Sequence, residues 1–184
     1  MSSPAPEKGQ IAPLDRLLSL SCAVLTVSDH RTPATDTSGD LLVRHLEAAG
    51  HRCIRRDMSV DNVYAIRRIL SDWIVAGDVK VILTNGGTGF KPGNSVPDAV
   101  VPLLDREIDG FGELFRMVSY REIGSAAMQS RALAGVANSR IIFCLPGSEG
   151  SCNLGWEHLI RPQLDSRTRP CNFATAFRQG ATTC

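Results

Sequence analysis

Short apolar runs alternate with amphipathic stretches along the first half of this chain. Residues 21–28 form a continuous run of small, apolar and β-branched side chains, which predicts a buried strand. Residues 38–49 and 62–76 place leucine, isoleucine and tryptophan side chains at helical spacing. Two further strands are predicted at 51–58 and 79–84, and the greater polarity of the first indicates a position near a sheet edge.

The second half of the chain continues this pattern with shorter elements. We expect helices or helical turns at 96–105, 111–121, 126–129 and 151–164. Residues 131–136 and 140–145 predict two strands about an Asn-Ser turn. Because strands alternate with helices, the pattern predicts an α/β fold, a three-layer sandwich with a mostly parallel central sheet.

The composition is that of one ordered domain. Of 184 residues, 43% are hydrophobic and 21% are charged, which is ordinary for a globular protein. Residues 1–13 are rich in Ser, Pro, Ala and charge, and predict a flexible arm before a domain at 14–170 and a tail at 171–184. Because 20 Lys and Arg are offset by 19 Asp and Glu, the balance argues against a polybasic nucleic-acid binder.

The apolar runs and the cysteines indicate a reducing compartment. No run approaches the ~20 apolar residues that span a bilayer, and no signal peptide is indicated. The six cysteines include no C-x-x-C pair, which argues against a zinc knuckle. Cys22, Cys53 and Cys144 lie inside apolar runs, so we expect them to be buried. We therefore predict a cytoplasmic protein with free thiols and without membrane contact.

A glycine-rich turn directly follows the strand predicted at 79–84. Gly86, Gly87 and Gly89 allow backbone amides to approach an anion closely, and Thr88 adds a hydroxyl. Two familiar phosphate motifs are absent, since Gly93 is followed by Asn rather than the Lys of a Walker A loop and no G-x-G-x-x-G occurs. The turn is either a phosphate cradle or a tight connection between a strand and a helix.

Polar residues near three other element boundaries have two interpretations each. Asp61 follows a predicted strand and either holds Mg²⁺ together with phosphates or caps the next helix. Ser38 and Gly39 either begin a helix or bind phosphate at its positive end. The Ser95–Asp98 stretch resembles a capping box, in which Asp98 either caps the helix or belongs to the site.

Two stretches in the second half of the chain also have two interpretations each. Ser130 and Arg131 either pin an anion or form an ordinary surface ion pair. The turn of Pro146, Gly147 and Ser148 follows a predicted strand and either cradles a ligand or only reverses the chain. The four histidines are scattered and indicate no metal triad, and both tryptophans lie on predicted helices as expected core residues.

Together these stretches resemble the MoaB/MogA family of molybdenum-cofactor biosynthesis proteins, which shares a domain with gephyrin. The resemblance covers about residues 20–164 and comes in family order. Arg116-Met-Val-Ser-Tyr120 and Arg169-Pro-Cys-Asn-Phe173 resemble the MoaB branch in particular. The ordered set consists of Leu25-Thr-Val-Ser28, Asp36-Thr-Ser-Gly39, Gly86-Gly-Thr-Gly89, Pro97-Asp-Ala99, Asp105-Arg-Glu107, Gly110-Phe-Gly-Glu113, Phe115-Arg116, Ser130-Arg131 and Leu145-Pro-Gly-Ser148.

The resemblance implies a molybdopterin-binding fold and an adenylyl transfer from Mg²⁺-ATP to molybdopterin. It also implies trimers or hexamers, for which Phe111, Leu114 and Phe115 offer apolar contacts, and association with other enzymes of cofactor biosynthesis. By position, Asp61 matches the carboxylate tied to Mg²⁺-ATP, and we expect Asp61, Asn94 and Asp98 to form the catalytic group. The implied cofactor-binding residues are Ser38, Gly39, Gly86, Gly87, Thr88, Gly89, Glu113, Arg116, Ser130, Arg131, Pro146, Gly147 and Ser148.

Two departures from the family pattern bear on catalysis. Asn94 stands where the family has an Asp, so an oxygen ligand is kept while its negative charge is lost. Glu149 and Gly150 follow the second turn, where the family usually has a Lys that contacts phosphate. The alternative prediction is therefore a non-catalytic pterin-binding oligomer or pathway scaffold that has lost the transfer reaction.

Overall fold

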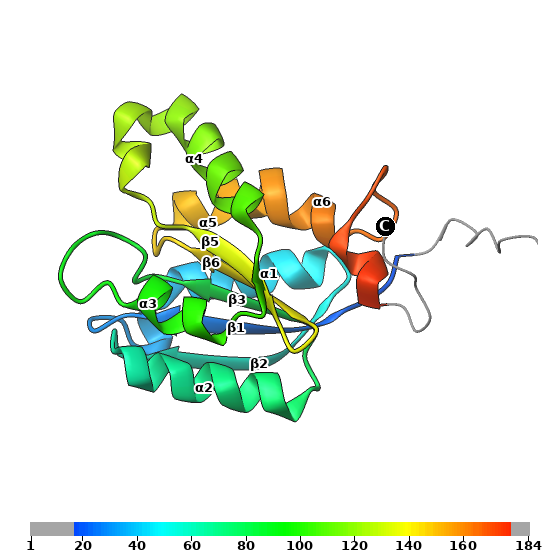
Figure 1. The fold of residues 1–184 in the computed structure, drawn as a ribbon, viewed down its shortest axis with the longest axis horizontal. Coiled ribbons are helices and arrows are strands. Elements are labelled where there is room, and N and C mark those ends of the chain that lie inside the picture. Colours follow the sequence, from blue (N-terminus) through cyan, green and yellow to red (C-terminus); the bar gives the residue numbers. More distant parts are fainter. Residues whose placement is uncertain (1–16, 178–184) are drawn as a thin grey trace, which may run out of the picture.

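A six-stranded sheet in the order β2-β1-β3-β6-β5-β4 forms the centre of the molecule (Figure 1). The computed structural model describes residues 17–177. Four neighbouring strands run parallel, β2 (Arg52–Ser59), β1 (Ser21–Val27), β3 (Val81–Asn85) and β6 (Arg140–Leu145). Two antiparallel strands complete the sheet, β5 (Leu133–Ala137) and β4 (Arg106–Glu107). The mostly parallel sheet and the edge position of the polar strand β2 are confirmed.

Helices cover both faces of this sheet and complete the predicted three layers (Figure 1). One face carries α1 (Thr37–Ala48), α4 (Asp109–Ile123), α5 (Glu149–Gly155) and α6 (Arg161–Leu164). The other face carries α2 (Val63–Ala76) and α3 (Val96–Val100). A π-helical stretch, η4 (Trp156–Ile160), joins α5 to α6, and short 3₁₀ turns are η1 (Pro33–Thr35), η2 (Val101–Leu103), η3 (Gly124–Gln129) and η5 (Phe173–Phe177).

Alternating side chains of β1 build the core on both faces. Cys22 and Val24 pack with α1 and α5, whereas Ala23 and Leu25 pack with α2, and all four are fully buried. A strand covered on both sides must be apolar at every position, which is why its sequence is a continuous apolar run. Both predicted core tryptophans, at 73 and 156, are buried.

Two sequence predictions, one about an element end and one about burial, are wrong. The helix expected at 96–105 ends at Val100, because Pro102 lacks an amide hydrogen and favours a 3₁₀ turn. The chain then pairs with β5 as the short strand β4, and the Asp105 amide donates to Val136 O at 2.8 Å. Cys53 is only half-buried because it lies on the edge strand β2.

The phenylalanines of α4 belong to the core rather than to an exposed surface. The rings of Phe111 and Phe115 lie 6.3 Å apart and are buried, and Phe111 also contacts Phe143 at 5.2 Å. Their expected role in an oligomer contact is therefore wrong, whereas Leu114 on the same helix is 46% exposed. A helix that is packed along one stripe leaves only its outer stripe for partners.

The described domain extends beyond residue 170. Phe173 and Ala174 pack against the core, within the part that was expected to be tail. The predicted arm at 1–13 and positions 178–184 lie outside the described residues. Between residues 17 and 177, no helix is both long and apolar enough to cross a membrane.

Candidate functional site

The predicted site residues gather where the parallel strands end. Asp61 follows β2, Asp29 and Arg31 follow β1, and the two glycine-bearing turns follow β3 and β6. The chain crosses from β1 to β2 through α1 and continues from β3 toward β6 on the other side, so the strand order reverses between β1 and β3. Such a reversal opens a crevice outside the strand ends, where α/β sheets bind ligands. The loop between β3 and α3 projects beyond this edge (Figure 1).

Backbone atoms pack directly against one another at this reversal. The Gly86 amide donates to Leu145 O at 3.0 Å, and a Cβ added to Gly86 would lie 2.1 Å from Val27 O. A Cβ on Gly147 would lie 3.1 Å from Gly86 Cα. Gly86 also has a φ of +95°, so only glycine fits here without strain. The ends of three strands are thereby held close together.

The Asp61 carboxylate faces the glycine-rich turn. Its Oδ1 accepts a hydrogen bond from the Ser95 amide at 2.8 Å, and both oxygens lie 3.1–3.2 Å from the position that a Cβ on Gly87 would occupy. The Asp61 amide donates to Asp29 Oδ1 at 2.9 Å, which brings a second carboxylate to the same place. The alternative that Asp61 caps α2 is wrong, because Asn62 is the cap and accepts from Tyr64 and Ala65.

Asn94 and Arg131 hold the loop that follows the glycine-rich turn. Asn94 Oδ1 accepts from the Gly89 amide at 2.8 Å. Arg131 Nε donates to Gly89 O at 2.9 Å, its Nη2 donates to Asn94 O, and its amide donates to Thr88 O at 3.0 Å. The Asn94 side chain therefore fixes the shape of the loop, which its position in the sequence did not reveal.

Asp98 does not cap α3. Ser95 has helical backbone angles and makes no side-chain cap hydrogen bond, so the predicted capping box is wrong. Instead the Asp98 side chain is 67% exposed and lies 3.6 Å from Arg131 Nη1. This contact matches the alternative of an ordinary surface ion pair for Arg131, and such exposed pairs add little stability.

The start of α1 forms a buried network beside the crevice. The N-cap is Asp36, which is fully buried and accepts from Gly39 N, Thr26 Oγ1 and Arg56 Nη2 at 2.7–3.0 Å. The sequence also predicted that a helix begins here, but placed its start at Ser38 and Gly39. The buried Asp36 carboxylate already accepts a hydrogen bond from an amide at the start of α1, and its charge offsets the positive end of the helix dipole.

Ser38 joins this helix to the turn after β6. Its hydroxyl donates to Gly147 O at 2.8 Å and accepts from Arg31 Nη1 at 2.7 Å, and the side chain is buried. Arg31 remains 31% exposed, so it places a positive charge at the rim of the crevice. Sequence reasoning did not assign Asp29, Arg31 or Asp36 to the site, although Asp36 stands in the family motif at 36–39. For Asp29 and Arg31 the signal was polarity soon after the buried strand β1.

The remaining predicted residues lie on the turn after β6, on the segment before β5 and on α4. Ser148 caps α5 and accepts from the Ser151 amide at 3.2 Å. Ser130 O accepts from Arg116 Nη1 at 3.5 Å, whereas Glu113 is exposed on α4. These positions connect the second wall of the crevice to α4.

The chemistry available at this edge is that of charge and hydrogen bonding. Burial raises the pKa of the Cys152 thiol to about 12, and its Sγ donates to Pro146 O at 3.3 Å, so no thiolate nucleophile is present there at neutral pH. Within residues 17–177, no group of three or more His, Cys, Asp or Glu side chains could hold a metal ion by itself. Glycine amides, two carboxylates and one arginine suit a phosphate-bearing ligand.

Comparisons with known proteins find a matching family and similar sequences. Residues 23–166 match the family described as "Probable molybdopterin binding domain". Molybdenum cofactor biosynthesis protein B of Escherichia coli K12 is 52% identical over 151 residues, which cover 82% of this chain and 89% of that protein.

Solved structures show the same fold. A crystal structure of a molybdenum cofactor biosynthesis protein B superposes with a TM-score of 0.78 and 44% identity, covering 80% of this chain and 92% of that one. The tungsten cofactor synthesizing protein MoaB from Pyrococcus furiosus superposes with a TM-score of 0.69 and 29% identity, covering 76% and 89%.

Proposed function

This chain belongs to the molybdopterin-binding domain family, and from that membership we propose that it binds molybdopterin at the carboxyl edge of its sheet and serves in molybdenum-cofactor biosynthesis. The observation that carries the proposal is the meeting of Asp61 with Gly87 at the reversal between β1 and β3. A phosphate-bearing pterin and a nucleotide both require amides and positive charge of the kind gathered there.

The proposed reaction is adenylyl transfer from ATP to molybdopterin. An oxygen of the terminal phosphate of the pterin forms a bond to the α-phosphorus of ATP, and the bond from that phosphorus to the pyrophosphate oxygen breaks. Adenylylated molybdopterin and pyrophosphate result. The protein supplies position and charge: in the turn at 86–89 the Gly87 and Thr88 amides hold phosphate oxygens, since the Gly86 and Gly89 amides already donate to Leu145 O and Asn94 Oδ1, and Arg31 offsets negative charge at the rim.

Mg²⁺ fits the residues present when phosphates complete its ligands. It is usually held by one or two carboxylates together with substrate phosphates; Asp61 supplies one carboxylate, and that of Asp29 lies at the Asp61 backbone amide. When bound, Mg²⁺ neutralises phosphate charge. The protein's own part is to orient Asp61, which the Ser95 amide does at 2.8 Å.

The decisive experiment measures pyrophosphate release from Mg²⁺-ATP in the presence and absence of molybdopterin. Asp61→Asn keeps an acceptor for the Ser95 amide and removes only the charge, so we expect release to fall by about 10²–10³-fold. Asp57→Asn is the matched control, because Asp57 is exposed on β2 and its side chain accepts a hydrogen bond from the backbone amide of the neighbouring Met58. Wild-type rates in Asp61→Asn would exclude Asp61 from catalysis.

A second candidate function, a non-catalytic pterin-binding oligomer, is favoured by Asn94. Its side chain accepts the Gly89 amide and carries no charge, so it holds the loop without contributing a carboxylate. Asn94→Asp keeps this acceptor and adds the charge. If the wild type binds molybdopterin without releasing pyrophosphate and Asn94→Asp releases it, the second function holds. If the wild type already releases pyrophosphate, Asn94 has not abolished the reaction and the second function is excluded.

We also propose that the chain assembles as a trimer or hexamer, in contact with other cofactor-biosynthesis proteins. Support comes from an exposed apolar stripe on α4 at three-residue spacing: Leu114, Met117, Tyr120 and Ile123 are 46–62% exposed, and Met128 on η3 is 76% exposed. A contiguous exposed apolar surface of this kind commonly marks an interface. The cytoplasmic location of the protein stays a prediction.

A further inference from the structure

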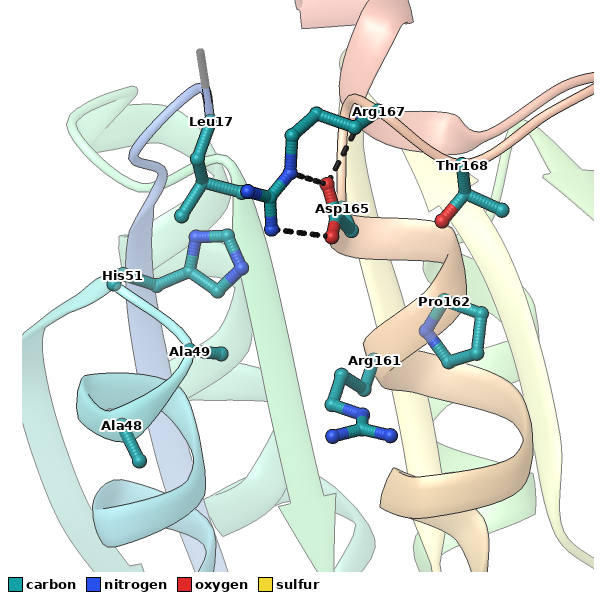
Figure 2. A pocket seen from close by; sticks show the side chains of 10 residues that line it. Leu17, Ala48, Ala49, His51, Arg161, Pro162, Asp165, Arg167 and Thr168 are labelled. Atoms are coloured by element: carbon teal, nitrogen blue, oxygen red, sulfur yellow. Dashed lines mark hydrogen bonds and ion pairs between the residues drawn. The ribbon is translucent and has the colours of Figure 1, made fainter. Parts of the chain in front are cut away.

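A cavity of about 640 Å³ lies at the other end of the sheet, where the parallel strands begin (Figure 2). Leu17 precedes β1 and Gly50 and His51 precede β2, while residues 161–168 form the opposite wall. None of its lining residues belongs to the crevice at the carboxyl edge. Its volume is within the range of small-molecule sites, which is about 300–1,000 Å³.

The segment that forms the opposite wall is fixed by buried hydrogen bonds. Ser166 is fully buried, and its Oγ accepts from the Leu18 amide at 2.9 Å. The Thr168 amide donates to Asp165 O at 3.0 Å, and Asn172 Nδ2 donates to Thr168 O at 2.9 Å. The cavity is therefore bounded on this side by an ordered turn.

Two guanidinium groups border the cavity (Figure 2). Arg167 is held in a fork by Asp165, with Nε–Oδ1 at 2.9 Å and Nη2–Oδ2 at 2.8 Å, so its orientation is set in advance. Arg161 lies 3.1 Å from Glu157 and its side chain is 57% exposed, so most of its donors are available. Each guanidinium group thus has one carboxylate partner, Glu157 outside the lining for Arg161 and Asp165 within it for Arg167, and Arg161 is the one whose remaining donors face the cavity.

His51 adds a neutral donor to this wall. Its Nδ1 accepts from the Leu20 amide at 3.3 Å, so in the neutral ring Nε2 carries the hydrogen. Burial lowers the pKa of His51, against the opposing charge of Asp165, which keeps the ring neutral near pH 7. The Thr168 side chain supplies a hydroxyl, and apolar surface comes from Leu17, Ala48, Ala49 and Pro162.

We propose that this cavity is a second binding site, which takes a small organic anion with a carboxylate or phosphate group on an apolar body. The exposed guanidinium of Arg161 binds the anionic group, and the apolar wall receives the body of the molecule. A cation does not suit the site, because its one carboxylate is already paired in the fork. The proposal does not depend on the function proposed above.

The test is calorimetric titration of the full chain with phenyl phosphate, benzoate and benzyl alcohol. We expect at least one of the two anions to bind and the neutral alcohol not to bind. A preference for phenyl phosphate identifies a phosphate ligand, and a preference for benzoate identifies a carboxylate. Arg161→Gln, at an exposed position that does not affect folding, should weaken the anion at least about tenfold. Arg68→Gln, exposed on α2, is the control and should leave affinity unchanged.

Three results would overturn the proposal. The first is that neither anion binds. The second is that an anion binds equally well to Arg161→Gln, Arg167→Gln and the wild type, which means that it binds elsewhere, including at the carboxyl edge. The third is that light scattering shows a lower mass for Arg161→Gln, which means that a second copy of the chain covers the cavity.

Discussion

Replacing Gly87 by alanine tests the central contact of the proposed active site. Gly87 has a φ of +62°, where a side chain is strained. The added Cβ would lie 2.8 Å from Val96 Cγ2 and 3.1–3.2 Å from both carboxylate oxygens of Asp61. The fully buried Val96 methyl group is the nearest atom and must shift, and the Asp61 carboxylate must give way as well. The substitution therefore acts on the backbone and on the carboxylate together.

The size of the effect follows from two contributions. A non-glycine residue in the left-handed region costs about 1–2 kcal/mol. Displacing Asp61 from the Ser95 amide removes a hydrogen bond to a charged group, which contributes about 1.5–3 kcal/mol, although partial relaxation keeps some of it. We expect the free energy of unfolding to fall by about 2–4 kcal/mol, which for a domain of this size lowers Tm by about 4–16 °C.

The assay combines urea unfolding at one fixed protein concentration with pyrophosphate release. Gly110→Ala is the matched control, because a Cβ there meets open space at the start of α4 and glycine-to-alanine changes in helices gain about 0.5–1 kcal/mol. Gly87→Ala should lose both stability and turnover, whereas Gly110→Ala should keep both. If Gly87→Ala unfolds at the wild-type urea concentration and releases pyrophosphate at the wild-type rate, the assigned contact between Asp61 and Gly87 is wrong.

Two further predictions concern assembly and pH. Met117→Glu places a charge in the exposed stripe of α4, so light scattering at micromolar concentration should show a smaller species than the wild type; a wild-type monomer would refute the proposed oligomer. Burial lowers the pKa of His51, so the unfolded chain takes up its proton first as pH falls below about 6.5, and stability should decrease from there toward acid pH. His51→Asn, which offers an acceptor to the Leu20 amide, should lose less stability over that window in urea unfolding, and an equal loss in both proteins would exclude His51 as the cause.

Most of the fold could be predicted because the pattern along the chain depends on local burial. A strand such as β1 is covered on both faces, so its sequence is apolar throughout, and the amphipathic helices show which side faces the sheet. The short strand β4 could not be predicted, since only its pairing with β5 makes two exposed residues a strand. The early end of α3 could have been inferred from Pro102 alone.

The candidate site could be predicted only in part, for a related reason. The glycine-rich turn could be predicted because it follows the apolar strand β3, and Asp61 because it is a carboxylate just after the end of β2. The partners that fix them are distant in sequence: Ser95 binds Asp61 across 34 positions, and Ser38 binds Gly147 across 109. Asn94 illustrates the limit, because its sequence position indicates a lost carboxylate, whereas its side chain holds the Gly89 amide. Contacts between residues so far apart in the sequence depend on the fold and cannot be inferred from spacing along the chain.

The place of β6 in the sheet has a consequence for synthesis on the ribosome. β3 ends at Asn85, and the strand that pairs with its open side begins about 55 residues later, at Arg140. At about 5–20 residues per second, translation leaves the apolar edge of β3 without its partner for about 3–11 s. Unpaired apolar edges promote aggregation. Nascent chains that stall before Arg140 should therefore depend most on chaperones, and the hairpin of β5 and β6 should end that dependence when it emerges.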